Sequence, residues 1–205
     1  MLSLHKVQCL RGERELFNGI DLALHPGEIL RIEGPNGSGK TSLLRIVAGL
    51  SAPANGEIRW CNEPIAELGE DYFRELLYIG HFAAVKDELT VIENLLLTLE
   101  LAAEPAARAD AKAALAEAGL KDRLHLPAKY LSQGQRRRVA LARLCLSKRP
   151  LWILDEPFTA LDVAAVLWVA ELIAAQLSRN GIVLFTTHQD AAIPGYTPKT
   201  LKLNS

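Results

Sequence analysis

The sequence predicts an α/β fold in which a mainly parallel sheet is interrupted by a mostly helical segment. Residues 151–154 are a continuous apolar run followed by two acidic residues, as expected of a strand buried on both faces. A second apolar run at residues 182–185 follows a helix-forming segment at residues 164–177. Strands that alternate with helices are typical of parallel sheets. We therefore expect an α/β core at the C-terminal end of the chain.

The N-terminal part is expected to begin with antiparallel strands. Apolar residues alternate with polar ones over residues 2–7 and again over residues 20–24, and Pro26 and Gly27 mark a turn. Residues 28–33 have the composition of a further strand, which leads into a glycine-rich segment. A helix is expected immediately after that segment.

The middle of the chain has a helical pattern. Thr90 and Glu93 have the spacing of a capping box at the start of a leucine-rich helix. A later helix is expected to begin at Ser132 and to continue until Pro150. We expect one domain over residues 1–205, with an α/β core formed by 1–84 and 150–205 and a helical lobe inserted at 85–149.

The net charge of −1 gives no reason to expect nucleic-acid binding. The basic run at residues 136–138 is short and is expected to be a solvated helix face. Cys9, Cys61 and Cys145 are far apart and have no metal-ligand spacing, so neither a disulfide framework nor a zinc site is expected. We expect these thiols to be small buried residues in a reducing compartment.

No membrane-spanning segment is expected. The N-terminus lacks the basic region and apolar core of a secretory signal. Asp155, Glu156, Asp162 and Glu171 interrupt the longest apolar stretch. If the protein works at a membrane, another protein is expected to hold it there.

Residues 34–41 match the phosphate-loop pattern GxxxxGK[ST] in full. Glycines allow the backbone N–H groups to point at phosphate oxygens, and the following helix adds the positive end of its dipole. Lys40 is expected to reach the β- and γ-phosphates, and Thr41 to offer its hydroxyl to Mg²⁺. The residues expected to contact the nucleotide here are Gly34, Pro35, Asn36, Gly37, Ser38, Gly39, Lys40, Thr41 and Ser42.

Asp155 and Glu156 follow the buried strand at residues 151–154. A carboxylate in this place can hold Mg²⁺, which is the role expected of Asp155. Glu156 is then placed to act as the general base on the attacking water. Two acids after a strand are also commonly just its solvated end, but their pairing with a phosphate loop favours the catalytic interpretation.

Residues 131–135 (Leu-Ser-Gln-Gly-Gln) allow two interpretations, which are compatible. Ser132 and Gln135 have the spacing of a capping box that begins a helix. A capped helix N-terminus with Gly134 beside it is also an anion site. We call residues 131–135 the signature segment.

Taken together, these motifs resemble those of ATP-binding cassette (ABC) ATPase subunits, over nearly the whole chain. The phosphate loop, the signature segment, Asp155-Glu156, Asp162 and His188 occur in the family's order and spacing. The resemblance implies a P-loop NTPase fold that hydrolyses ATP with Mg²⁺ bound through Thr41 and Asp155. It also implies a homodimer in which two chains sandwich two nucleotides head to tail.

The resemblance further implies roles across that dimer. Ser132 and Gly134, with Gln133 and Gln135 beside them, would contact the γ-phosphate of ATP held by the other chain. Asp162 would help the two sites to communicate. His188 would contact the γ-phosphate and support Glu156 in catalysis.

Three positions depart from the family pattern. Gln133 replaces the usual glycine. This restricts the backbone conformations available at this position but is not expected to abolish activity. Arg11 falls near the usual adenine-stacking aromatic, and it either stacks on the base through its guanidinium or is a surface residue. His81 replaces the usual glutamine, and it either faces the Mg²⁺ and water region, couples to a membrane partner, or is an exposed loop residue.

Within the family, Gly80-His81 and the segments 152–162 and 186–189 resemble the ATPase subunits of bacterial cytochrome c maturation. This resemblance implies the membrane partners CcmB, CcmC and CcmD, and a peripheral location on the cytoplasmic face of the inner membrane. ATP hydrolysis would drive haem export or release of a haem-loaded chaperone. Direct haem binding by this chain is not expected.

Two alternatives remain within the family: a soluble, scaffold-associated ABC ATPase, and the ATPase subunit of another small ABC transporter. A P-loop kinase or a nucleic-acid ATPase is less favoured, because the signature segment has no role in a small-molecule kinase.

Overall fold

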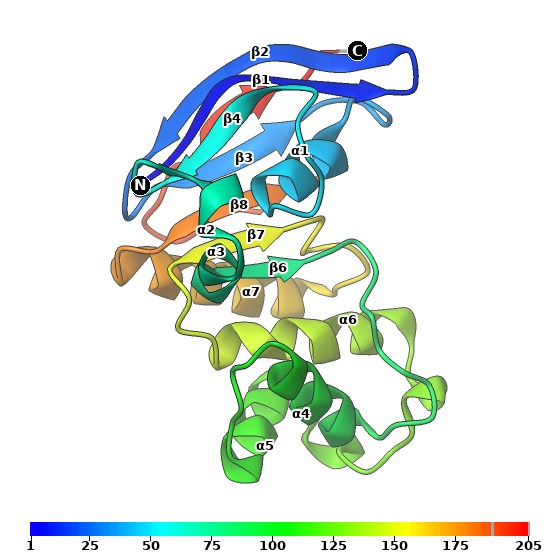
Figure 1. Cartoon of the computed structure of the whole chain (residues 1–205). Coiled ribbons are helices and arrows are strands. Elements are labelled where there is room, and N and C mark those ends of the chain that lie inside the picture. The colour runs from blue at the N-terminus through cyan, green and yellow to red at the C-terminus, as the bar shows by residue number, and fades with distance from the viewer. Residues whose placement is uncertain (190, 205) are drawn as a thin grey trace.

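The computed structural model describes residues 1–189 and 191–204, and Figure 1 shows its layers, with an antiparallel sheet at the top and the helical segment at the bottom. The strands are β1 (Leu2–Arg11), β2 (Arg14–Leu24), β3 (Ile29–Glu33), β4 (Asn55–Trp60), β5 (Glu63–Pro64), β6 (Leu76–Ile79), β7 (Leu151–Leu154), β8 (Ile182–Thr186) and β9 (Lys199–Lys202). The helices are α1 (Lys40–Val47), α2 (Ile65–Leu68), α3 (Glu70–Glu75), α4 (Val91–Leu101), α5 (Arg108–Glu117), α6 (Gln133–Leu141) and α7 (Val163–Ser178). Three 3-10 turns, η1 (Lys121–Arg123), η2 (Ala128–Tyr130) and η3 (Ala142–Cys145), complete the described elements.

The core is a five-stranded parallel sheet with strand order β6-β7-β8-β3-β9, as the alternation of strands and helices predicted. Its interior strand β7, between β6 and β8, is buried on both faces. Leu151 and Ile153 join one apolar cluster, and Trp152 and Leu154 join another on the opposite face. This explains why β7 is a continuous apolar run rather than an alternating one.

The antiparallel sheet, with order β2-β1-β4-β5, covers one face of this core (Figure 1). The apolar cluster between the two sheets includes Leu2 and Leu4 of β1, Leu43 and Leu44 of α1, and residues of β3, β7 and β8. α1 is therefore held between the two sheets. This packing fixes the direction of its N-terminus.

The opposite face of the parallel sheet packs against α7, whose Val169, Ile173 and Leu177 share a cluster with Trp152. The helical segment beyond it has a separate cluster that joins α4, α5 and α6, including Leu95, Leu115 and Val139. The predicted division of the chain into a core and a lobe at 85–149 remains a prediction.

Parallel strands bring the loops at their carboxyl ends to one edge of a sheet, which is where ligands of open α/β sheets bind. The loops that follow β3, β6 and β7 are residues 34–39, 80–90 and 155–162, and residues 187–189 come directly after β8. The phosphate loop, His81, Asp155, Glu156 and His188 therefore lie at the same edge of the sheet.

Two expectations about local structure were wrong. The helix from Ser132 does not continue to Pro150: α6 ends at Leu141, and a 3-10 turn follows. Apolar spacing does not distinguish the two helix types over one turn, because both place residues i and i+3 on the same side. Cys61 is exposed, unlike the buried Cys9, because it lies in the tight turn between β4 and β5 with a φ of 52°.

Among the residues that the structure describes, no helix is long and apolar enough to cross a membrane.

Asn94 of α4 fixes the loop that leads into the lobe. Its buried side chain donates to the carbonyls of Lys86, Leu89 and Thr90, and it accepts from the Lys86 amide at 2.7 Å. We predict that Asn94→Ala lowers the free energy of unfolding by about 2 to 3 kcal/mol, because buried backbone groups lose their partners. Urea unfolding measures this loss, and hydrogen exchange should accelerate at residues 86–90.

The exposed Asn55, whose side chain accepts a hydrogen bond from the neighbouring Gly56 amide, provides the control. Asn55→Ala should change stability by less than about 0.5 kcal/mol. Equal losses in the two variants would contradict the role given to Asn94.

Candidate active site

The phosphate loop needs its glycines for two physical reasons. Gly34, Gly37 and Gly39 have φ values of 153°, 81° and 98°, which other residues rarely adopt. A Cβ on Gly34 would lie 2.6 Å from the Leu203 carbonyl oxygen, and one on Gly39 would lie 3.0 Å from the Phe17 ring. The loop therefore packs closely against Leu203 and Phe17, and α1 begins directly after Gly39.

Lys40 folds back over this loop. Its Nζ donates to the carbonyl oxygens of Gly34 at 2.7 Å and Pro35 at 3.1 Å, and its side chain is nearly buried. The buried Ser38 hydroxyl has no hydrogen-bond partner among residues 1–189 and 191–204. A cationic amine and a free hydroxyl inside a glycine loop are donors suited to an anionic ligand.

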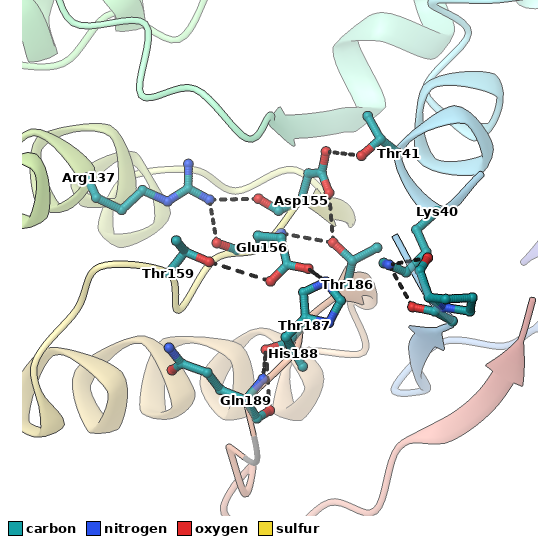
Figure 2. Close-up of polar contacts among 12 residues, drawn as sticks. Lys40, Thr41, Arg137, Asp155, Glu156, Thr159, Thr186, Thr187, His188 and Gln189 are labelled. Carbon is teal, nitrogen blue, oxygen red and sulfur yellow. Dashed lines mark hydrogen bonds and ion pairs between the residues drawn. The ribbon is translucent and has the colours of Figure 1, made fainter. Parts of the chain in front are cut away.

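Asp155 connects the phosphate loop to the sheet, as Figure 2 shows. Thr41 Oγ1 donates to its Oδ2 at 2.8 Å, and Thr186 Oγ1 donates to its Oδ1 at 2.7 Å. Asp155 is only 1% exposed, so these two bonds compensate for the burial of its carboxylate. The negative charge of Asp155 also reaches Tyr78, whose pKa is raised mainly by burial and further by this charge.

Glu156 points away from Asp155 because its backbone turns into the left-handed region, with a φ of 51°. Its N–H donates to Thr186 Oγ1 at 2.9 Å. Its Oε1 lies 3.4 Å from Nε2 of His188, and Thr159 Oγ1 lies 3.5 Å from its Oε2. The carboxylate is thus nearly buried between a half-exposed histidine and a threonine.

These groups line one cavity of about 500 Å³. Its lining from the described residues is Arg11, Leu16, Asn36, Gly37, Gly39, Lys40, Thr41, Ser42, His81, Asp155, Glu156, Thr159 and His188. Most of the residues predicted to bind nucleotide or to catalyse therefore meet in one place, including the uncertain Arg11 and His81. Gly34, Pro35 and Ser38 belong to the same loop but do not line the cavity.

The signature segment lies outside this cavity. Ser132 caps α6, and its side chain and that of Gln135 form the predicted capping box. A Cβ on Gly134 would lie 2.4 Å from the Ala160 carbonyl oxygen, so glycine is required for close packing. Gln133 instead lines a second cavity of about 310 Å³ with His81 and Arg137.

Asp162 also lies outside the main cavity, at the N-terminus of α7. Its Oδ1 accepts from the Ala165 amide at 2.9 Å, and Arg138 pairs with its Oδ2. The Ala165 hydrogen bond, followed by the charge of Arg138, lowers the pKa of Asp162 below its ordinary value. The acid therefore stays ionised and ties α7 to α6.

Sequence reasoning missed Thr159 and Thr186, and it was wrong about Arg137. The run at residues 136–138 was expected to be solvated, but Arg137 is 4% exposed and its guanidinium contacts the backbone of Asp155 and Glu156. A threonine after an apolar strand and an arginine in a basic run are common, so no local signal identified them.

Comparison with known proteins agrees with this geometry. The sequence pattern described as ABC transporter matches residues 17–159. The chain belongs to the ABC transporter family. It is 53% identical over 203 residues to the cytochrome c biogenesis ATP-binding export protein CcmA of Dechloromonas aromatica, with 99% of this chain and 100% of the relative covered. The protein of the same name from Pseudomonas aeruginosa is 44% identical, with all of both chains covered.

Solved structures confirm the predicted fold of this ABC ATPase. A dimeric bacterial ABC transporter cassette, MJ0796, is 26% identical with a TM-score of 0.84, and the match covers 100% of this chain and 94% of that one. The same cassette in a post-hydrolysis dimer bound to ADP and phosphate is 27% identical with a TM-score of 0.79, over 92% and 88% of the two chains. This chain is therefore an ATP-binding ATPase of the ABC type, and related cassettes form dimers.

Thr186 holds both carboxylate residues through one hydroxyl. We predict that Thr186→Val lowers kcat for ATP by about 10-fold or more, since a buried hydrogen bond to a charged group contributes about 1.5 to 3 kcal/mol. Thr186→Ser keeps the hydroxyl and should retain most of the activity. Phosphate release assays measure both variants, and equal activity in the two would contradict this role of the hydroxyl.

Proposed function

We propose that this chain is the ATP-hydrolysing subunit of a membrane export complex for cytochrome c biogenesis. The support is twofold. Its curated relatives named for that process match over essentially the full chain. The observation that carries the ATPase mechanism is the bond of Thr41 to Asp155, which joins the phosphate loop to the acidic end of β7.

The oxygen donors at this junction fit Mg²⁺. The Thr41 hydroxyl and the Asp155 carboxylate are hard ligands, and Mg²⁺ usually takes only one or two protein ligands beside phosphates and waters. No cluster of three or more His, Cys, Asp or Glu side chains suited to a metal occurs among residues 1–189 and 191–204. We propose that Thr41 and Asp155 hold the ion together with ATP. When bound, Mg²⁺ neutralises part of the phosphate charge.

Hydrolysis then depends on residues that line the cavity. The phosphate loop holds the β- and γ-phosphates, and Lys40 exchanges its loop carbonyls for phosphate oxygens. Glu156 accepts a proton from water as that water attacks the γ-phosphorus and the bond to ADP breaks. His188, whose side chain is 55% exposed and lies beside Glu156, is placed to donate to the γ-phosphate.

The position of the signature segment supports a homodimer. Ser132 and Gly134 lie at the exposed N-terminus of α6 but outside the cavity of their own chain. A helix N-terminus attracts anions. We propose that two chains pair head to tail, so that each α6 N-terminus meets the γ-phosphate held by the other chain.

The loop after β6 supports contact with a membrane partner. The Phe82 side chain is 86% exposed, and with His81 and Arg136 it lines the second cavity. Arg136 pairs with Asp87, which ties this loop to α6. We propose that residues 82–88 contact CcmB, CcmC or CcmD at the cytoplasmic face of the inner membrane, and that opening of the dimer is transmitted there.

We predict that Glu156→Gln binds Mg-ATP but lowers kcat by about 100-fold or more, because the general base is lost. Captured from solubilised membranes with Mg-ATP, this variant should retain haem-handling membrane subunits, identified by mass spectrometry. The exposed Glu171 of α7 provides the matched control, since Glu171→Gln should keep the wild-type kcat.

The proteins captured with Glu156→Gln test the membrane complex and the assignment to cytochrome c biogenesis separately. Recovery of an unrelated permease would contradict the assignment to cytochrome c biogenesis but leave a transporter ATPase. Recovery of partners without any membrane protein would contradict the membrane complex. Full hydrolysis by the Glu156→Gln variant would contradict the role of Glu156.

A further inference from the structure

Arg137 connects the helical segment to the catalytic backbone. Its side chain leaves α6 and approaches the β7 end from the side opposite Thr41, as Figure 2 shows. Nη2 donates to the carbonyl oxygens of Asp155 at 2.7 Å and Glu156 at 2.9 Å. Nη1 donates to the carbonyl oxygens of Gly80 at 2.7 Å and His81 at 3.3 Å. One guanidinium therefore binds two loops that both border the cavity.

The backbone that Arg137 holds has an unfavourable conformation. Glu156 has a φ of 51°, in the left-handed region that a residue with a Cβ rarely adopts. Such a conformation persists only where the surroundings determine it. Here the Thr186 hydroxyl binds the Glu156 amide, and Arg137 binds the carbonyls on both sides of the Glu156 Cα. Without Arg137, two of these three hydrogen bonds are lost.

A buried arginine needs a reason, because removing a cation from water is costly. Burial lowers the pKa of Arg137, while the charges of Asp155 and Glu156 oppose that shift. Its contacts are backbone carbonyls rather than a carboxylate, so ion pairing does not explain its position. The planar guanidinium of an arginine can donate to two pairs of carbonyls at once, whereas the compact ammonium of a lysine cannot.

We propose that Arg137 is a positioning residue that directs the Glu156 carboxylate and couples it to the loop carrying His81. It acts through the backbone and touches no reacting atom. Because α6 begins with the signature segment, any displacement of α6 moves both loops together. The inference rests on the proposed role of Glu156 as general base.

The test compares Arg137→Met with Arg137→Lys in the full-length protein. Arg137→Met should lower kcat by about 10-fold or more, because small misplacements of a catalytic group are costly. The Kd for Mg-ATP should stay within about 2-fold, because Arg137 does not contact the phosphate loop. Arg137→Lys keeps a cation that can bind part of the carbonyl set and should have an intermediate kcat.

Arg143 provides a matched control for lost stability. It is a largely buried arginine of η3 beside Glu104, and burial lowers its pKa as well. Arg143→Met should reduce the Tm about as much as Arg137→Met does, yet keep kcat within about 2-fold of wild type.

Two results would overturn the proposal: a wild-type kcat in Arg137→Met, or a loss of kcat that Arg143→Met shares at the same Tm. Failure of this inference is distinguishable from failure of the proposed function. If Glu156→Gln is inactive and Arg137→Met is fully active, only the positioning role of Arg137 is contradicted. If Glu156→Gln is active, the role of Glu156 as general base is contradicted.

Discussion

The structure depends on the buried carboxylate of Asp155. A charge that is 1% exposed at the end of a buried strand must be satisfied by hydrogen bonds. Thr41 and Thr186 satisfy it, and they come from the first turn of α1 and the last residue of β8. This requirement fixes α1 against the sheet, and with it the phosphate loop. The same turn that buries Asp155 directs Glu156 toward the cavity.

The second constraint is the attachment of the helical segment. From the middle of α6, Arg137 binds the loops after β6 and β7. Beyond η3, Arg149 binds the carbonyls of Phe73 and Leu76 in the core and pairs with Glu104. α6 is therefore held to the core near the catalytic residues while its own N-terminus faces outward.

The sequence predicted those features whose physics is local. The glycines of the phosphate loop and the capping boxes at Thr90 and Ser132 act within a few residues, so their spacing identifies them. The parallel sheet followed from apolar runs. Thr186 and Arg137 were not predicted, because their partners lie 31 and up to 57 residues away in the chain. Their residue types are common on surfaces, and only the fold shows that both are buried.

In the proposed dimer, each active site combines Glu156 of one chain with the signature segment of another. The most direct test mixes two inactive variants, Ser132→Arg and Glu156→Gln, and measures ATP hydrolysis by the mixture. We expect the mixture to recover activity, because a mixed dimer contains one site with both parts intact. If the mixture stays as inactive as either variant alone, although mixed dimers form, this shared active site is contradicted.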